Sequence, residues 1–244
     1  MGFLDSDPIP RKTMVLFFVV DTSGSMSGNK IGSVNEAIHG ILPELKDISA
    51  ENADAQIKIA GLQFSTGAKW LYDRPVEAEN FRWNDLKEGG VTDFGEALKM
   101  LNQKLSRNEF MKEAVGSFAP VILLLSDGAP TDSYKTRLKE LKENNWFKAA
   151  IKIAIAIGED AKKDILEEFT GNAECVLLAT NPEVLKKMIR VASVSASQIG
   201  SKSTSTGVES KQEEMGKQLQ ELVKEELPTI KDTNNSSKTQ TDDW

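Results

Sequence analysis

The sequence predicts an α/β fold: a doubly wound, mostly parallel central sheet flanked by helices, with one antiparallel edge strand. Three observations support this prediction. Short apolar runs recur along the chain, most of them end in a polar, glycine-bearing loop, and a segment with helical periodicity follows such loops. Continuous apolar runs suit strands buried on both faces of a parallel sheet. Right-handed crossovers between such strands place their carboxyl-end loops at one edge.

The amino-terminal half begins with a strand predicted over Met14–Val20, a run of aliphatic and aromatic residues (MVLFFVV). After a polar loop, apolar residues from 31 to 45 recur at helical spacing, and Pro43 is expected to kink or end that helix. Gln56–Phe64 is the second predicted strand. It is expected to pair with Ala68–Leu71 across a Ser-Thr-Gly turn, which gives the antiparallel edge. Tyr72–Lys87 is interpreted as a loop with a short helix.

The carboxyl-terminal half repeats the alternation of helix and strand. A helical pattern starts at Phe94 and precedes a buried strand, APVILLL. A polar turn then leads into another helix. The remaining predicted strands and helices are Ala119–Leu125, Ala149–Ile157, Asp160–Phe169, Glu174–Leu178 and Pro182–Ile199.

The chain is predicted to hold one large domain between two appended segments. Residues 1–11 form an arm, 12–200 the domain and 201–244 a polar tail rich in Ser, Thr, Lys, Gln and Glu. Disorder is expected from Gly200 to Gly207 and from Thr229 onward. Between these stretches, apolar residues at positions 215, 219, 222 and 223 predict an amphipathic helix within 208–227, closed by Pro228. Docking of this helix on its own domain is favoured over partner binding.

Composition restricts the possible chemistry. His39 and Cys175 are the only histidine and the only cysteine of the chain. A zinc site of Cys and His ligands and an internal disulfide are therefore excluded, and any metal must be held by oxygen, as Mg²⁺, Mn²⁺ or Ca²⁺ are. The net charge of −7 and the lack of basic clusters argue against nucleic acid. Without a signal-peptide pattern or a long apolar run, a cytoplasmic protein without a membrane span is expected.

Polar side chains follow the predicted strands where ligands bind in such sheets. Asp21, Ser23 and Ser25 form the pattern DxSxS directly after the first strand. Thr92 precedes a helix, and Asp127 follows the strand APVILLLS. Because these loops share one edge of the sheet, two carboxylates and three hydroxyls are expected to converge.

This donor set suits a hard divalent cation. Mg²⁺ prefers octahedral oxygen coordination and releases water reluctantly, so three hydroxyls and two aspartates leave at least one position open or water-filled. The helices that follow the loops begin near the metal, and their amino termini favour an anion. A site that holds a metal and then accepts an acidic oxygen is therefore predicted.

The segments MVLFFVVDTSGSMSG, GGVTDFGEAL and VILLLSDGAPTD closely resemble the metal-ion-dependent adhesion site (MIDAS) of von Willebrand factor A domains. The resemblance covers roughly residues 12–200. It implies that the Ser and Thr hydroxyls bind the metal directly, that the Asp carboxylates often act through water, and that a partner supplies Glu or Asp. The segment SDGAPTD is most similar to bacterial TerY-like proteins of tellurium-resistance and stress-response systems, which are associated with kinases and phosphatases.

Structural roles compete with these assignments. Asp21 or Asp127 alone would more often be a helix cap, but two aspartates with three hydroxyls favour a metal site. Asp93 is open between a cap, a group behind the ligands and a water-mediated ligand. Gly24 and Gly128 are placed beside the ligands, chiefly for backbone geometry. Other residues are expected to cap or pack rather than bind: Ser27, Asp132, Met26, His39, Cys175, Trp70, Trp83 and Trp146.

Three functions remain open at this point. The preferred one is a metal-dependent protein-interaction module without enzymatic activity, whose partner offers Asp or Glu to the metal. The second is Mg²⁺-dependent phosphotransfer using Asp21, although Ser23 stands where a haloacid-dehalogenase-type phosphatase has its acid. The third is a scaffold with a structural metal. A serine hydrolase is disfavoured because His39 is expected far from the strand ends.

Overall fold

The computed structural model describes residues 11–113, 116–201 and 210–226 of the chain. Its centre is one sheet, ordered β3-β2-β1-β5-β6-β7, with β4 pairing to β2 beside this path. The pairs β1–β2, β1–β5, β5–β6 and β6–β7 are parallel, whereas β3 and β4 run antiparallel to β2. The strands are β1 (Lys12–Asp21), β2 (Ala55–Ser65), β3 (Gly67–Trp70), β4 (Val76–Glu77), β5 (Val121–Ser126), β6 (Ile151–Ile157) and β7 (Val176–Ala179).

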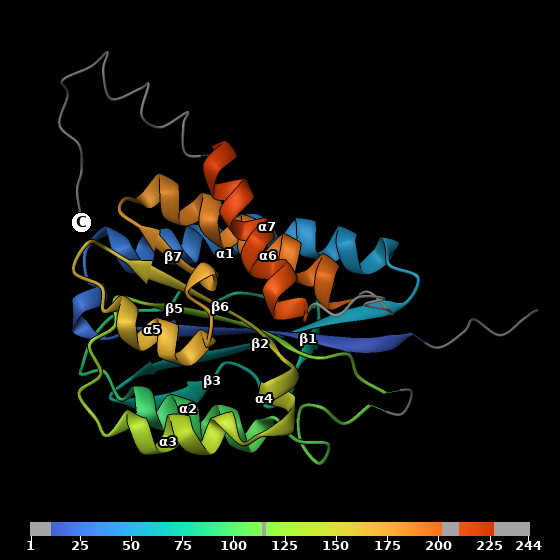
Figure 1. Ribbon diagram of the computed structural model, residues 1–244, viewed down its shortest axis with the longest axis horizontal. Coiled ribbons are helices and arrows are strands. Elements are labelled where there is room, and N and C mark those ends of the chain that lie inside the picture. Colours follow the sequence, from blue (N-terminus) through green and yellow to red (C-terminus); the bar gives the residue numbers. More distant parts are fainter. Residues whose placement is uncertain (1–10, 114–115, 202–209, 227–244) are drawn as a thin grey trace, which may run out of the picture.

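Helices cover both faces of the sheet, as Figure 1 shows. Each face has its own apolar core, since alternate residues of the central strands point to opposite sides. One layer contains α1 (Asn29–Glu51), α6 (Pro182–Gly200) and α7 (Lys211–Glu226). The other contains α2 (Phe94–Lys104), α3 (Tyr134–Lys142), α4 (Asn145–Ala149) and α5 (Lys163–Thr170). The predicted doubly wound fold with its antiparallel edge is confirmed.

Two local expectations were wrong. Helix α1 continues through Pro43 to Glu51, because Leu45 and Ser49 beyond the proline are buried. The short helix expected within Tyr72–Lys87 is not found among the described residues. That segment instead contains β4 and a turn, since the backbone of β2 pairs with Val76 and Glu77.

The segment that precedes the Thr92 loop is held against α1 by one polar side chain. Asn35 of α1 is buried, and its Nδ2 donates to Leu86 O at 2.9 Å. Its Oδ1 accepts from Trp83 Nε1 and from Leu86 N, both at 3.0 Å. Three hydrogen bonds in a buried position fix this stretch against α1. The chain is therefore anchored to α1 just before the two glycines at 89 and 90.

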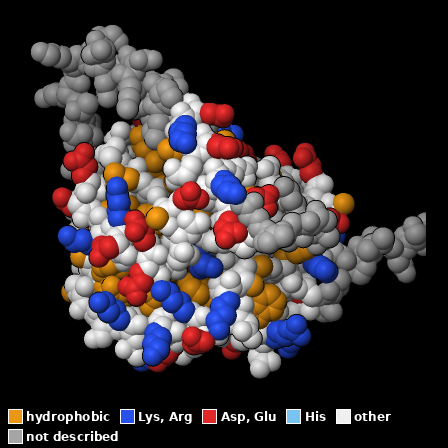
Figure 2. Space-filling model, viewed as in Figure 1, with side chains coloured by type: hydrophobic (Ala, Val, Ile, Leu, Met, Phe, Trp, Pro, Cys, Tyr) orange, Lys and Arg blue, Asp and Glu red, His pale blue; other side chains and the backbone are white. Residues whose placement is uncertain are grey.

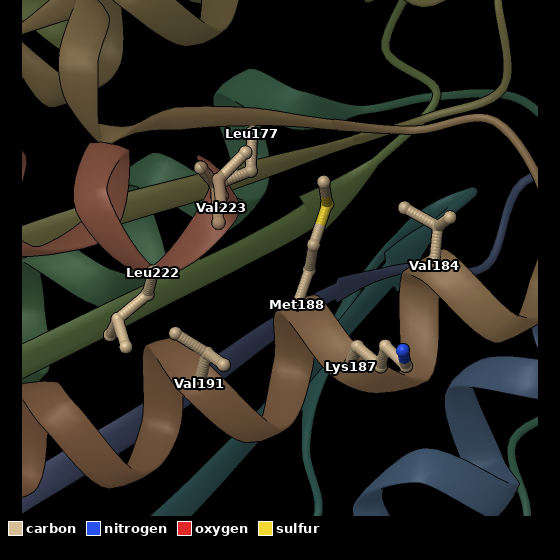
Figure 3. Close-up of a pocket in the computed structure, with 7 residues that line it drawn as sticks. All are labelled: Leu177, Val184, Lys187, Met188, Val191, Leu222 and Val223. Atoms are coloured by element: carbon tan, nitrogen blue, oxygen red, sulfur yellow. The ribbon is translucent and has the colours of Figure 1, made fainter. Parts of the chain in front are cut away.

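The amphipathic segment after residue 210 forms α7 and packs on the same molecule. Met215 and Leu219 are completely buried in the core of the α1–α6 layer. Figure 3 shows the contact with α6, where Val191 lies beside Leu222 and Met188 lines the same pocket. The hollow left between them measures about 20 Å³, room for roughly one water molecule. The side chains of α6 and α7 therefore pack with little unfilled space.

Helix α7 also completes the sheet. Gln212 Oε1 accepts from Lys152 N at 2.7 Å, and Gln212 Nε2 donates to Lys152 O at 2.9 Å. One side-chain amide thus pairs both backbone groups of a β6 residue, as a neighbouring strand would. Lys152 lies two positions before the first β6–β7 pair, Ala154 with Val176, so β7 does not reach it.

Most of the expectations for the two ends of the chain concern residues that the structure does not describe. Residues 1–10 of the arm, and the disorder expected over 202–207 and from Thr229 onward, are outside the described residues. Gly200 ends α6. The boundaries of domain and tail stay a prediction. Among the described helices, none combines the length and apolar character that crossing a membrane requires.

Candidate metal centre

Asp21 is the last residue of β1 and is completely buried. Its Oδ1 accepts from the backbone N–H of Ser23 at 2.8 Å, and its Oδ2 accepts from Ser126 Oγ at 2.6 Å. The first contact turns the chain sharply out of β1 and into the one-turn helix η1 (Gly24–Met26). The second ties β1 to the end of β5. Asp21 is therefore fixed at the carboxyl ends of the two central strands.

A chain of hydroxyl contacts connects the loop after β1, called the first loop, to the loop after β5, called the third loop. Ser23 Oγ lies 3.0 Å from Ser25 Oγ, and Ser25 Oγ donates to Asp127 Oδ1 at 2.8 Å. Asp127 follows β5, so 102 residues separate the partners of the second contact. Four of the five predicted ligands are thus joined, directly or through one another, at one edge of the sheet.

Thr92, in the loop before α2 (the second loop), lies at the same edge of the sheet. It is 6% exposed and lines a small hollow together with Ser126 and Gly128. Its backbone is fixed to the third loop, because Thr92 N donates to Thr131 Oγ1 at 3.1 Å and Thr131 N donates to Thr92 O at 2.9 Å. All five predicted ligands therefore lie around the ends of β1 and β5.

Two glycines make these contacts possible. Gly24 N donates to Gly90 O at 3.0 Å, and a Cβ on Gly24 would lie 3.3 Å from that oxygen. Gly128 has φ of 62°, a left-handed value, and a Cβ there would lie 3.2 Å from Ser126 Oγ. Small residues thus let the loops approach each other and leave Ser126 free to reach Asp21. Both glycines lie beside the candidate ligands.

The side chain of Asp93 points toward the turn between β2 and β3. Its Oδ2 accepts from Gly67 N at 2.8 Å, and its own N–H donates to Ser65 O at 2.8 Å. The side chain therefore ties the start of α2 to the turn between β2 and β3. Of the roles left open for Asp93, the contacts favour a structural one. Ser27 is not the cap of α1, which begins after Gly28.

The amino terminus of α2 is already satisfied by an internal carboxylate. Asp132 Oδ1 accepts from Gly95 N at 3.0 Å, and its Oδ2 accepts from Glu96 N at 3.2 Å. The expectation that helix termini remain available to an incoming carboxylate is therefore wrong for α2. Asp132 is a cap, as predicted, but of a helix that precedes it in the chain.

The site contains one cation of its own. Lys30, in the first turn of α1, places Nζ 2.8 Å from Asp127 Oδ2, and the two side chains are 16% and 7% exposed. Asp127 thus shares its two oxygens between a hydroxyl and an ammonium group. Sequence reasoning missed Lys30. The available signal was a charged residue in the first turn of the helix that follows the loop.

Burial raises the pKa of Asp21 above its ordinary value of 3.8, and repulsion from Asp127 adds to this. The hydrogen bonds from Ser126 and Ser23 act in the opposite direction and lower it, but burial is the largest cause. A buried carboxylate whose partners are neutral donors lacks a balancing positive charge. This is the condition that a bound cation relieves.

The donor set fits a divalent cation held by oxygen. Within the described residues, no group of three or more His, Cys, Asp or Glu side chains could hold a metal. The hydroxyls of Ser23, Ser25 and Thr92 are therefore required beside the two aspartates. Oxygen donors of low total charge suit Mg²⁺, Mn²⁺ or Ca²⁺ better than softer metals. Ser126, which sequence reasoning also missed, orients Asp21 from the last position of β5.

Comparison with known proteins matches most of the chain to one family. Residues 16–191 match the family model described as von Willebrand factor type A domain. Mouse inter alpha-trypsin inhibitor heavy chain 4 is 29% identical over 130 residues, which are 50% of this chain and 13% of that protein. This chain therefore spans a small part of that relative.

Solved structures share the fold at low identity. The pilus adhesin SpaC from Lactobacillus rhamnosus GG has a TM-score of 0.60 and 13% identity, over 78% of this chain and 31% of that one. The ArnB paralog VWA2 from Sulfolobus acidocaldarius has a TM-score of 0.52 and 20% identity, over 73% and 44%. Proximal thread matrix protein 1 from the mussel byssus, with a zinc-occupied MIDAS motif, has a TM-score of 0.55 and 16% identity, over 75% and 48%.

Proposed function

The chain belongs to the von Willebrand factor type A domain family, and from that membership we propose that it is a metal-dependent protein-interaction module. Domains of this family typically mediate such interactions. In the proposal, the hydroxyls of Ser23, Ser25 and Thr92 hold one divalent cation, in the first place Mg²⁺, with Mn²⁺ or Ca²⁺ as substitutes. Asp21 and Asp127 balance its charge.

One observation supports this proposal most strongly. Ser23, Ser25 and Asp127 form a continuous chain of contacts of 2.8–3.0 Å across two loops, beside a completely buried Asp21. The neutral donors around Asp21 leave its charge unbalanced, and nothing among its described contacts offsets the repulsion from Asp127. A shared cation does so, because it attracts both carboxylates and all the hydroxyl oxygens.

The partner is proposed to be a protein that offers an Asp or Glu side chain. When bound, the cation supplies positions that can accept an anionic oxygen. The chain itself contributes an exposed rim of small residues, including Gly24, Ser25 and Ala129, which leaves space for a side chain to approach. Rigid loops, tied by the Gly24–Gly90 and Thr92–Thr131 contacts, hold this rim in place.

The burial of Asp21 argues against the phosphotransfer alternative. A nucleophilic carboxylate needs an oxygen open to the substrate, whereas both oxygens of Asp21 accept hydrogen bonds and the residue is 0% exposed. The scaffold alternative differs from the proposal only in whether an acidic ligand binds to the cation. Acetate binding to the metal-loaded protein separates the interaction module from the scaffold.

A narrower setting is also proposed. The resemblance of residues 126–132 to TerY-like proteins suggests a cytoplasmic role in a bacterial tellurium-resistance or stress-response system, with a kinase or phosphatase as partner. Capture of such an enzyme by the wild type with Mg²⁺, but not in chelator and not by Asp21→Ala, would support this setting.

The direct test is calorimetric titration of chelator-treated protein with Mg²⁺, Mn²⁺ and Ca²⁺. Ser25→Ala removes a hydroxyl of the contact chain, and Ser27→Ala, in an exposed position of the same loop, is the matched control. We expect binding in the wild type and in Ser27→Ala, and its loss in Ser25→Ala. Metal binding that is equal in all three proteins, or absent from the wild type, would overturn the proposal.

Ligand binding is tested on the Mn²⁺-loaded protein with acetate as the probe. Acetate that replaces water on Mn²⁺ lowers the relaxation rate of solvent protons, and acetamide, which is neutral, is the control. A fall with acetate alone supports the interaction module. Metal binding without any response to acetate would favour the scaffold with a structural metal.

A further inference from the structure

Lys30 holds a position that the ligand set does not account for. Its ammonium group lies 2.8 Å from Asp127 Oδ2, while the other oxygen of Asp127 accepts from Ser25. Both side chains of the ion pair are largely withdrawn from solvent, at 16% and 7% exposed. An ion pair at this depth is screened less than a surface pair. Lys30 therefore acts on whatever charge the site holds.

The charges of the site do not cancel once Lys30 is counted. The carboxylates of Asp21 and Asp127 offset the two positive charges of a divalent cation, which leaves a neutral centre. Lys30 adds one positive charge on the far side of Asp127. The loaded site then has a net positive charge, although its ligands alone would leave it neutral.

The amino terminus of α2 does not provide this positive charge. The N–H groups of Gly95 and Glu96, which have no partner within the helix, already donate to Asp132. A helix terminus neutralised by an internal carboxylate has little attraction left for an external one. Among the described contacts of the ligand residues, Lys30 is the charged group that remains.

We propose that Lys30 sets the balance of the site between cation and anion: it weakens binding of the divalent cation and strengthens binding of a carboxylate to the loaded site. This inference rests on the proposed function, since it concerns the same cation. It assigns to Lys30 a role in ligand specificity, because a net positive site discriminates an acidic side chain from a neutral amide of the same shape.

The variants separate charge from structure. Lys30→Met removes the charge and keeps most of the aliphatic stem, and Lys30→Arg keeps the charge. Lys30→Gln is a second neutral variant whose amide can still donate to Asp127, in case the methionine variant does not fold. Lys46→Met, in an exposed position on the same helix, is the matched control.

Two measurements are made on each protein, Mg²⁺ affinity by calorimetry and acetate affinity of the Mn²⁺-loaded form by solvent proton relaxation. For both neutral variants we expect Mg²⁺ to bind about tenfold more tightly and acetate about tenfold more weakly, the effect of one nearby charge partly screened by water. Lys30→Arg and Lys46→Met should stay close to the wild type. In chelator, the neutral variants should melt about 3–8 °C lower, because Asp127 loses its cation.

The opposite signs make the test decisive. If Lys30 only supported the loop, its replacement would weaken both Mg²⁺ and acetate. That result, or unchanged affinities for both, would overturn the inference while leaving the proposed function intact. A wild-type protein that binds no Mg²⁺ would overturn the proposed function and this inference together.

Discussion

Replacement of Asp21 by asparagine exchanges a buried charge for a neutral group of the same shape. Asp21 is 0% exposed, with Oδ1 bonded to Ser23 N at 2.8 Å and Oδ2 bonded to Ser126 Oγ at 2.6 Å. Asparagine can keep both contacts, because its carbonyl oxygen accepts from Ser23 and its amide nitrogen donates to the hydroxyl oxygen of Ser126. The substitution therefore isolates the effect of the charge on stability.

The sign of the effect follows from the pKa. Burial raises the pKa of Asp21 above 3.8 in the folded protein. When the folded-state pKa of a carboxyl group lies above its unfolded value, ionisation favours unfolding. In chelator, the contribution of Asp21 to stability therefore falls as the pH rises from 3.8 through the folded-state pKa, and the full cost remains at neutral pH.

The size of that cost follows from the contacts. For a completely buried carboxylate with neutral hydrogen-bond donors, we expect a cost of about 1–3 kcal/mol. For a chain of this length, this corresponds to roughly 2–12 °C in the melting midpoint. Without metal at neutral pH, Asp21→Asn should thus melt above the wild type by this amount.

Thermal unfolding followed by circular dichroism, from acid to neutral pH, measures this difference. In chelator, the two midpoints should converge in acid and separate toward neutral pH. In saturating Mg²⁺ the order should reverse, since only the wild type retains the charge that offsets the cation. If Asp21→Asn is the less stable protein in chelator at neutral pH, or if the gap does not change with pH, the reasoning is refuted.

Three further substitutions, two of them with a control variant, test other parts of the fold. Leu219→Ala should lower the free energy of unfolding by about 2–5 kcal/mol, because the side chain is completely buried, whereas the exposed Glu221→Ala should change it by less than about 0.5 kcal/mol. Gly128→Ala should cost about 1–2 kcal/mol, because φ is 62°, and should also weaken Mg²⁺ binding, because the added Cβ displaces the hydroxyl that orients Asp21. Gly171→Ala, with φ of 70° and open space around its Cβ, should cost the same and leave Mg²⁺ affinity unchanged. Burial lowers the pKa of Lys152 from 10.5 to about 8, so the free energy of unfolding of the wild type, relative to that of Lys152→Met, should rise by roughly 3 kcal/mol between those pH values.

Urea unfolding measures the stability of all these variants, and calorimetry measures the metal affinities. Wild-type stability in Leu219→Ala would mean that α7 contributes nothing to the fold. Equal Mg²⁺ binding by the Gly128 and Gly171 variants, with equal losses of stability, would show that the Gly128 turn does not position the ligands. A pH dependence that persists in Lys152→Met would have to come from another group.

The strands, and the meeting of the candidate ligands at one edge of the sheet, could be predicted because each depends on a short stretch of sequence. β1 and β5 are apolar on both faces, since helices cover both sides of the sheet, and such runs are recognisable without knowing their neighbours. The parallel arrangement then brings Asp21 and Asp127 to one edge. Thr92 joins them because its loop crosses the same edge.

The features that the sequence did not indicate depend on contacts between distant segments. Asp132 caps a helix 37 residues before it, and Asn35 holds a segment 51 residues after it. Lys30 meets Asp127 across 97 residues. No local pattern distinguishes Asp132 and Asn35 from other polar residues, and the one local signal for Lys30 is its place in the first turn of the helix after the loop. The partners of all three are set by the packed fold.

The amide of Gln212 closes the backbone of β6 at Lys152 from a position 60 residues later in the chain. All the strands have been synthesised before α7 emerges from the ribosome. Until it does, Lys152 presents an unpaired N–H and C=O at the edge of β6, which is a template for a strand of another molecule. Translation that pauses after α6 would thus leave a nascent chain with β1 to β7 in place and these two backbone groups exposed, and the arrival of α7 would cover them.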